Sequence, residues 1–88
     1  MKLINTLTRL FGTDNVDDWN DVNDEDNVID YIVIYHNNNG DNECEPDYFL
    51  RHYDNGSYQL NDLSANVIHT GNDLAVLKKV LKNLPKSN

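Results

Sequence analysis

Carboxylate side chains are the groups in this sequence whose number and spacing point to a chemistry, the binding of cations. Between Leu10 and Leu50 the chain has twelve acidic residues and no Lys or Arg. The remainder is mildly basic, and the formal net charge of the 88 residues is −8. Nucleic acids and anionic membranes are disfavoured as partners, because their phosphates would be repelled. A positively charged protein surface is favoured, and the commonest such surface is one that normally holds DNA or RNA.

Several of these acids recur three or four residues apart between Asp14 and Glu25, which is helical spacing. On a helix such residues have Cβ atoms about 5–6 Å apart, so we expect a dense row of carboxylates. Their mutual repulsion works against folding, which favours a surface for a cationic partner over the alternative, a merely solvated acidic face. The candidate partner-binding residues are Asp14, Asp17, Asp18, Asp21, Asp24, Glu25, Asp26, Glu43, Glu45 and Asp47.

Four aromatic residues lie within the acidic block and are candidate anchors for a partner. Large aromatic side chains dominate the binding energy of many interfaces, but they also fill protein cores. We expect at least half of them to be packed in the core. They are Trp19, Tyr31, Tyr35 and Tyr48.

Cys44, His36, His52 and His69 are the residues with metal-ligating chemistry other than carboxylates. They could hold zinc if the loop around Cys44 folds back over a sheet, but no pair has a short C-x-x-C or H-x-x-x-H spacing. A nucleophilic Cys44 paired with His36 or His52 lacks any family signature. Residues 21–32 fail the EF-hand pattern at its sixth and twelfth positions. We therefore expect no metal, no cofactor and no enzymatic activity, with ordinary surface or half-buried histidines.

Two helices are expected, one near each end of the chain. The segment from Lys2 to Phe11 has leucines at helical spacing, and Gly12 is suited to end it. The second helix runs from Asp73 to about Leu84, with Asn72 or Thr70 as its cap and Pro85 at its end. Its apolar stripe is formed by Leu74, Leu77, Leu81 and Leu84, and its lysines face outward.

Three or four antiparallel strands lie between these helices. Val28 to His36 is β-branched and aromatic almost throughout, which is typical of a central strand. Residues 47–54 and 57–61 flank Asn55-Gly56, a dipeptide that favours a two-residue hairpin turn with positive φ at both positions. That turn predicts Tyr53 opposite Tyr58. A short fourth strand is expected through residues 67–69.

These elements predict a single α+β domain over residues 1–88, with a small three- to four-stranded sheet packed by the two terminal helices. The acidic segment 13–27 is expected to be a short helix, or a loop with a pair of turns held by Trp19. A single cysteine favours a reducing compartment. Polar residues interrupt the apolar start of the chain, and no apolar run approaches the roughly 20 residues of a membrane span, so we expect a soluble intracellular protein.

The short length, the acidic block over residues 14–47 and the expected sheet from Val28 to Asn61 resemble the small phage-encoded anti-CRISPR inhibitors of type II RNA-guided nucleases. The chain is also similar to other phage DNA mimics that block host defence enzymes. The resemblance implies an inhibitor that fills the DNA-binding or PAM-reading groove of the nuclease, or holds another lobe shut, in the cytoplasm of a bacterial host. It transfers no binding residue, so the candidate residues rest on charge.

Three other functions compete with this one at the level of sequence. The first is an immunity protein or antitoxin that neutralises a cationic toxin. The second is a small metal-binding accessory protein. The third is a phage accessory protein that self-associates, for which an exposed strand edge at Ser57 to Asn61 would allow strand addition.

Overall fold

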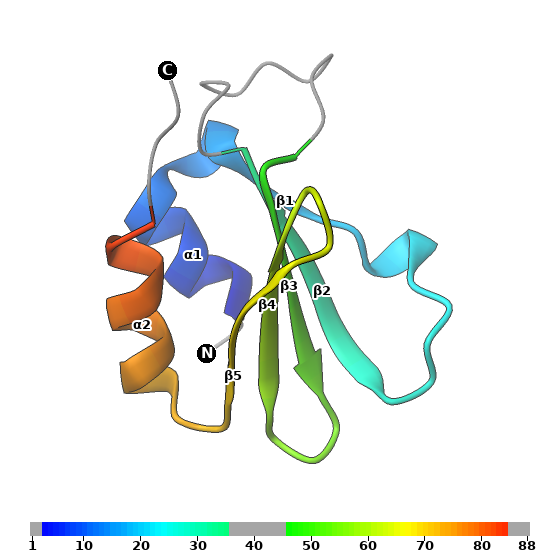
Figure 1. Ribbon diagram of the computed structural model, residues 1–88. Coiled ribbons are helices and arrows are strands. Elements are labelled where there is room, and N and C mark those ends of the chain that lie inside the picture. The colour runs from blue at the N-terminus through cyan, green and yellow to red at the C-terminus, as the bar shows by residue number, and fades with distance from the viewer. Residues whose placement is uncertain (1–2, 36–45, 85–88) are drawn as a thin grey trace.

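The computed structural model describes residues 3–35 and 46–84 and arranges them in two layers, with both helices on one face of an antiparallel sheet (Figure 1). The expected α+β class with an N-terminal and a C-terminal helix is confirmed. The elements in chain order are α1 (Leu3–Phe11), the short 3₁₀ turn η1 (Thr13–Asn15), β1 (Val16–Asp18), the 3₁₀ turn η2 (Asn20–Val22), β2 (Val28–Ile34), β3 (Tyr48–Tyr53), β4 (Tyr58–Asp62), β5 (Val67–Gly71) and α2 (Leu74–Lys82).

The sheet has five strands in the order β1-β2-β3-β4-β5, each antiparallel to its neighbour in sequence. The expected fourth strand is β5, whereas β1 was not expected from the sequence. Because β4 is paired with both β3 and β5, the expected exposed edge at Ser57 to Asn61 is wrong. The two edges of the sheet are β1 and β5.

The hydrophobic core lies between the sheet and the two helices. Ile32, Leu50 and Leu60 from three adjacent strands are fully buried against the leucines of both helices. Each helix presents an apolar stripe to the sheet, because its leucines recur every three or four residues. The cluster consists of Leu3, Leu7, Ile32, Ile34, Tyr48, Leu50, Leu60, Leu77, Leu81 and Leu84.

The end of α1 and the start of α2 each have a clear cause. Gly12 follows α1 with a φ of 92°, a conformation that favours glycine, and its N–H donates to the carbonyl of Thr8 at 2.8 Å. At the start of α2 the cap is Asp73, whose Oδ1 accepts from the N–H of Ala75 at 2.9 Å. The expected cap, Asn72 or Thr70, is therefore wrong. Thr70 belongs to β5, and Asp73 directly precedes the first helical residue.

The hairpin between β3 and β4 has a different turn from the one expected. Gly56 alone has positive φ there, and the N–H of Gly56 donates to the carbonyl of Tyr53 while the N–H of Tyr53 donates to Ser57. This is a three-residue loop, a turn followed by a left-handed residue. The extra loop residue shifts the register by one, so Tyr58 lies opposite His52 and not opposite Tyr53. A one-residue shift exchanges the two faces of a strand.

The loop between β4 and β5 repeats this geometry with alanine in the left-handed position. Ala65 has a φ of 67°, its N–H donates to the carbonyl of Asp62, and the N–H of Asp62 donates to Asn66. L-residues with a Cβ are disfavoured in this conformation by roughly 1–2 kcal/mol. Ala65 is thus the strained counterpart of Gly56.

We therefore expect Ala65→Gly to stabilise the protein by about 0.5–1 kcal/mol, since relief of strain exceeds the greater unfolded-state freedom of glycine. The matched variant Gly56→Ala should destabilise by about 1 kcal/mol. Its added Cβ would meet no atom within 4 Å, so the cost is one of backbone conformation alone. Chemical denaturation of both variants measures these changes. Equal effects of the same sign would show that the two loops do not share this strain.

The segment 13–27 is not the expected helix; the alternative, a pair of turns, is confirmed by η1 and η2, although the strand between them was not expected. Asn15 to Trp19 pair with β2, since Tyr35 donates its N–H to the carbonyl of Asn15 and Trp19 donates its N–H to the carbonyl of Tyr31. Two 3₁₀ turns flank the short strand. Apolar residues at every third position suit 3₁₀ turns as well as a helix, because residues three apart align in a 3₁₀ turn. The expected helical row of carboxylates is therefore wrong.

Candidate functional site

Seven of the ten candidate acids follow one another along the β1 side of the sheet. They lie on η1, β1, η2 and the loop that leads into β2, and all seven are exposed. We call this set the acidic edge. It consists of Asp14, Asp17, Asp18, Asp21, Asp24, Glu25 and Asp26.

Hydrogen bonds fix the central carboxylates of the acidic edge. Asp17 accepts from the N–H of Asp18 at 2.9 Å and from the indole Nε1 of Trp19 at 3.2 Å. Asp18 in turn accepts from the N–H of Asn20 at 2.8 Å. The charge of Asp17 also reaches Tyr35, whose pKa is raised above its ordinary value first by burial and second by that charge. The carboxylates of β1 are therefore held in place before any partner arrives.

The other three candidate acids do not extend this set. Glu43 and Glu45 lie outside the described residues. Asp47 is half-buried just before β3, and its N–H donates to the carbonyl of Ile34 at 2.8 Å. Its charge contributes, after burial, to a raised pKa of the neighbouring Tyr48.

The lysines of α2 lie away from the acidic edge, whereas α1, which carries Arg9, packs against β1 and η1. Arg9 of α1 and the lysines of α2 are on the helix layer, and Figure 1 places α2 and η2 at opposite sides of the molecule. Arg9, Lys78 and Lys82 line a common groove of about 160 Å³ between the two helices. Within residues 3–35 and 46–84, the acidic edge has one ion pair, between Glu25 and Arg51 at 3.9 Å. The negative charge is therefore not cancelled by the lysines of the last helix.

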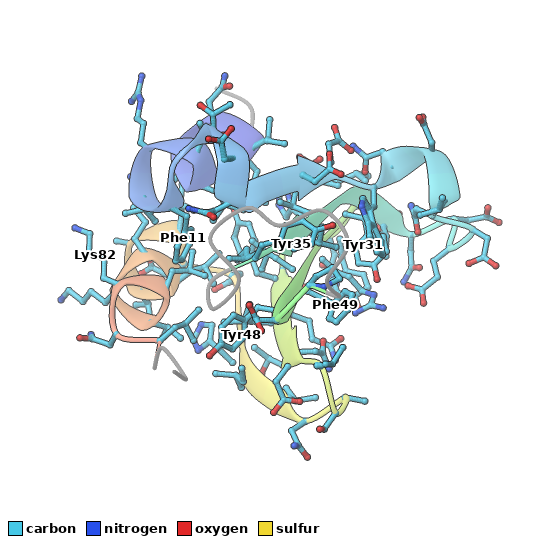
Figure 2. All side chains as sticks on the ribbon, turned by 90° about the horizontal axis from the view of Figure 1, so that it is seen from above. Phe11, Tyr31, Tyr35, Tyr48, Phe49 and Lys82 are labelled. Carbon is cyan, nitrogen blue, oxygen red and sulfur yellow. The ribbon has the colours of Figure 1, made fainter. Side chains whose placement is uncertain are left out.

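The sheet face opposite the helices carries an aromatic cluster that sequence analysis did not assemble. Trp19 makes edge-on contacts with Tyr31 and Phe49, at centroid distances of 6.3 and 6.2 Å, and Tyr31 stacks on Phe49 at 6.4 Å. Figure 2 shows Tyr31 and Phe49 on the side of the sheet away from Phe11 and Lys82. Trp19 and Tyr31 are partly exposed, whereas Tyr35 and Tyr48 are buried, so the expectation that half of the four aromatic residues belong to the interior is confirmed.

Arg51 lies at the centre of this face. Its guanidinium carbon is 4.8 Å from the centroid of the Tyr31 ring, and its Nη1 donates to Oδ1 of Asn61 at 3.4 Å. A linear charge count could not place it, since Arg51 directly follows the acid-only block in sequence but faces Glu25 in space. The register between β2 and β3, with Tyr31 opposite Arg51, brings it there.

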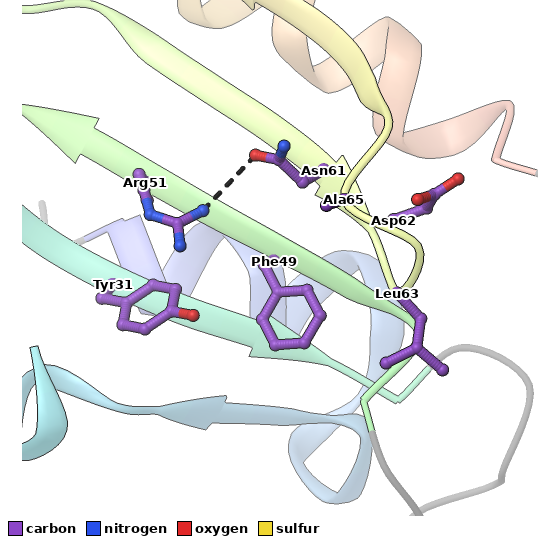
Figure 3. Close-up of a pocket in the computed structure, with 7 residues that line it drawn as sticks. All are labelled: Tyr31, Phe49, Arg51, Asn61, Asp62, Leu63 and Ala65. Carbon is purple, nitrogen blue, oxygen red and sulfur yellow. Dashed lines mark hydrogen bonds between the residues drawn. The ribbon is translucent and has the colours of Figure 1, made fainter.

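Two hollows open on either side of Arg51. One, of about 200 Å³, is shown in Figure 3 and is lined by Tyr31, Phe49, Arg51, Asn61, Asp62, Leu63 and Ala65. The other, of about 270 Å³, is lined by Trp19, Val22, Asn23, Asp24, Glu25, Tyr31 and Arg51. The second hollow therefore joins the acidic edge to the aromatic cluster, and we call it the Trp19 pocket.

The candidate metal ligands are dispersed in the part of the chain that can be described. His36 and Cys44 lie outside the described residues. His52 stacks on Tyr58 at a centroid distance of 4.3 Å, and His69 is on β5 opposite Leu60. Residues 3–35 and 46–84 contain no group of three or more potential ligands that could hold a metal ion.

Asp62, at the rim of the first hollow, predicts a pH dependence of stability. Hydrogen bonds from the side chain and the N–H of Asn66, and from the N–H of Ser64, lower its pKa below the ordinary value of 3.8. A carboxylate with a lowered folded-state pKa contributes stability that is complete above the unfolded-state value and is lost as the pH falls through the folded-state value.

The difference in the free energy of unfolding between the wild type and Asp62→Asn should therefore stay constant from neutral pH down to about 3.8 and narrow below it. Urea denaturation across that range measures the difference. A gap that stays unchanged into strong acid would contradict this role of the Asp62 charge.

No family model, no curated protein and no solved structure matches this chain. Within the two described ranges, neither helix is long and apolar enough to cross a membrane.

Proposed function

We propose that this chain is an acidic inhibitor that binds a basic groove of a host defence nuclease, and specifically an anti-CRISPR protein that blocks DNA binding by a type II RNA-guided nuclease. The observation that carries the proposal is the acidic edge, seven exposed carboxylates in succession along one side of the sheet. With the lysines of α2 at the opposite side of the molecule from η2, the acidic edge presents a strongly negative surface to a cationic groove.

Hydrogen bonds hold two carboxylates of the edge strand in place. Successive residues of a strand direct their side chains to opposite faces, so Asp17 and Asp18 place negative charge on both faces of β1. Asp17 and Asp18 are adjacent in β1 and are held by backbone hydrogen bonds. Pre-organised charges of this kind favour fast association that weakens as salt rises.

A purely structural role accounts for fewer of these residues. Charged side chains on an edge strand prevent pairing with a second sheet, and Asp17 and Asp18 suffice for that on β1. The remaining five acids lie on turns and a loop, where they protect no strand edge. Their concentration is therefore better explained by a partner.

The proposal is tested by DNA binding and cleavage assays with a panel of purified type II RNA-guided nucleases. We expect the protein to raise the apparent Kd for target DNA of at least one nuclease, with an effect that diminishes between 50 and 300 mM salt. Inhibition that is independent of salt, or no effect across the panel, would contradict the proposal. Tight binding to a cationic toxin in a parallel assay would favour the immunity-protein alternative.

A further inference from the structure

The Trp19 pocket combines three kinds of wall in one hollow. Aromatic rings come from Trp19 of the β1–η2 connection and Tyr31 of β2. Carboxylates come from Asp24 and Glu25 of the acidic edge, and Val22 contributes an apolar rim. Rings, carboxylates and aliphatic surface are the groups that receive a cationic side chain with a long hydrocarbon stem.

Arg51 shows within the protein how such a cation is received. Its guanidinium lies over the Tyr31 ring at 4.8 Å while its Nε faces Oε2 of Glu25 at 3.9 Å. The ion pair is at the long end of its range, and the side chains of Arg51 and Glu25 are 26% and 49% exposed. Exposed pairs of this kind contribute roughly 0–1 kcal/mol, so a second cation can compete with Arg51 for Glu25.

We infer that the Trp19 pocket binds one arginine side chain of the basic partner. The inference rests on the proposed function and identifies the point of the acidic edge that anchors the complex. Two carboxylates against the single charge of Arg51 leave the pocket net negative, so a cation is the complementary guest. A guanidinium fits better than an ammonium, because its planar group stacks on aromatic faces while it pairs with a carboxylate.

Val22 supports the same guest. Its side chain is 66% exposed although it lies beside the pocket, among the largest exposures of any described hydrophobic residue. The aliphatic stem of an arginine that reaches Glu25 would cover it. Burial of an exposed apolar side chain adds to the attraction between the charges.

The probe is a capped five-residue peptide with two arginines separated by glycine, compared with the same peptide carrying lysines. Two-dimensional ¹H–¹⁵N NMR follows the indole N–H of Trp19, the only tryptophan of the chain, and the amides of residues 22–25. We expect the arginine peptide to shift these signals and to bind at least threefold more tightly than the lysine peptide.

Two pairs of variants separate the pocket from the general charge of the edge. Glu25→Gln should weaken the arginine peptide about threefold to fivefold, whereas Asp14→Asn, the same charge change at the other end of the acidic edge, should weaken it less than twofold. Val22→Ser should weaken it about twofold to threefold, and Val76→Ser, on the exposed side of α2, should have no effect. Thermal unfolding of each variant confirms that it is folded.

The possible failures are distinguishable. Equal weakening by Asp14→Asn and Glu25→Gln, with no preference for arginine, would overturn the pocket and leave the proposed function standing, because the partner would then be held by the edge as a whole. Selective arginine binding that is lost in Glu25→Gln supports the pocket. If that binding is seen and the nuclease assays show no inhibition, the proposed function is abandoned and the pocket stands.

Discussion

Neutralisation of Asp17, Asp18 and Asp21 together is expected to weaken binding to the basic partner by roughly 10- to 150-fold. Each exposed charge contact contributes about 0.5–1 kcal/mol, and three contacts amount to about 1.5–3 kcal/mol. Asparagine keeps one acceptor oxygen, so position 18 can still accept from the N–H of Asn20, and position 17 can accept from one of its two donors, the N–H of residue 18 or the indole of Trp19. The loss of binding should therefore come mainly from the loss of charge.

The matched control changes the net charge equally on other surfaces. Asn5→Lys, Ser64→Lys and Asn72→Lys together also raise the net charge by three, and all three positions are exposed and lie outside the acidic edge. If the location of the charge matters, this control should bind the partner within about threefold of the wild type at physiological salt, where screening acts over about 8 Å. Titration calorimetry or surface plasmon resonance measures both variants. Equal losses would mean that net charge, not the acidic edge, governs binding.

Leu60→Ala is expected to destabilise the protein by about 3 kcal/mol. Leu60 is fully buried in the central strand pairing, opposite Leu50 on one side and His69 on the other. Truncation of a buried leucine costs about 2–5 kcal/mol through lost burial and the cavity that remains. A domain of this length has a total stability of roughly 4–13 kcal/mol, so the substitution removes roughly a quarter to three quarters of it.

Leu63→Ala provides the matched control for the same chemical change. Leu63 follows β4 in the adjoining loop and is 52% exposed, so its truncation should cost less than about 0.5 kcal/mol. Urea denaturation followed by the fluorescence of Trp19 reports both values, because its ring packs on Tyr31 and Phe49 in the folded state. Similar costs for the two leucines would contradict the placement of the core between sheet and helices.

The strongly patterned elements could be predicted from sequence alone. The leucine spacing predicted the helices α1 and α2, and the β-branched run predicted the strand β2. The structure confirms all three elements. The register of β3 and β4 could not be predicted, because Asn55-Gly56 fits both a two-residue and a three-residue loop. The residue count of the loop, which depends on the hydrogen bonds of Tyr53 and Ser57, decides which face each side chain joins.

The site was predictable in charge but not in shape. The acid-only block indicated the negative surface, yet residues spaced by three gave no basis for separating 3₁₀ turns around a short strand from a helix. The Trp19 pocket depends on pairing between distant segments, since Tyr31 meets Arg51 only through the register of β2 and β3. Such non-local contacts leave no mark in a single sequence.

The most direct test of the acidic edge uses two baits in a bacterial lysate at low salt, the wild type and the variant with asparagine at Asp17, Asp18 and Asp21. Bound proteins are then released by excess double-stranded DNA and quantified. The wild type should retain a nucleic-acid-binding protein that DNA displaces, and the triple variant should lose most of it. Equal retention by both baits, or a retained protein that DNA cannot displace, would contradict the claim that these carboxylates occupy a DNA-binding surface.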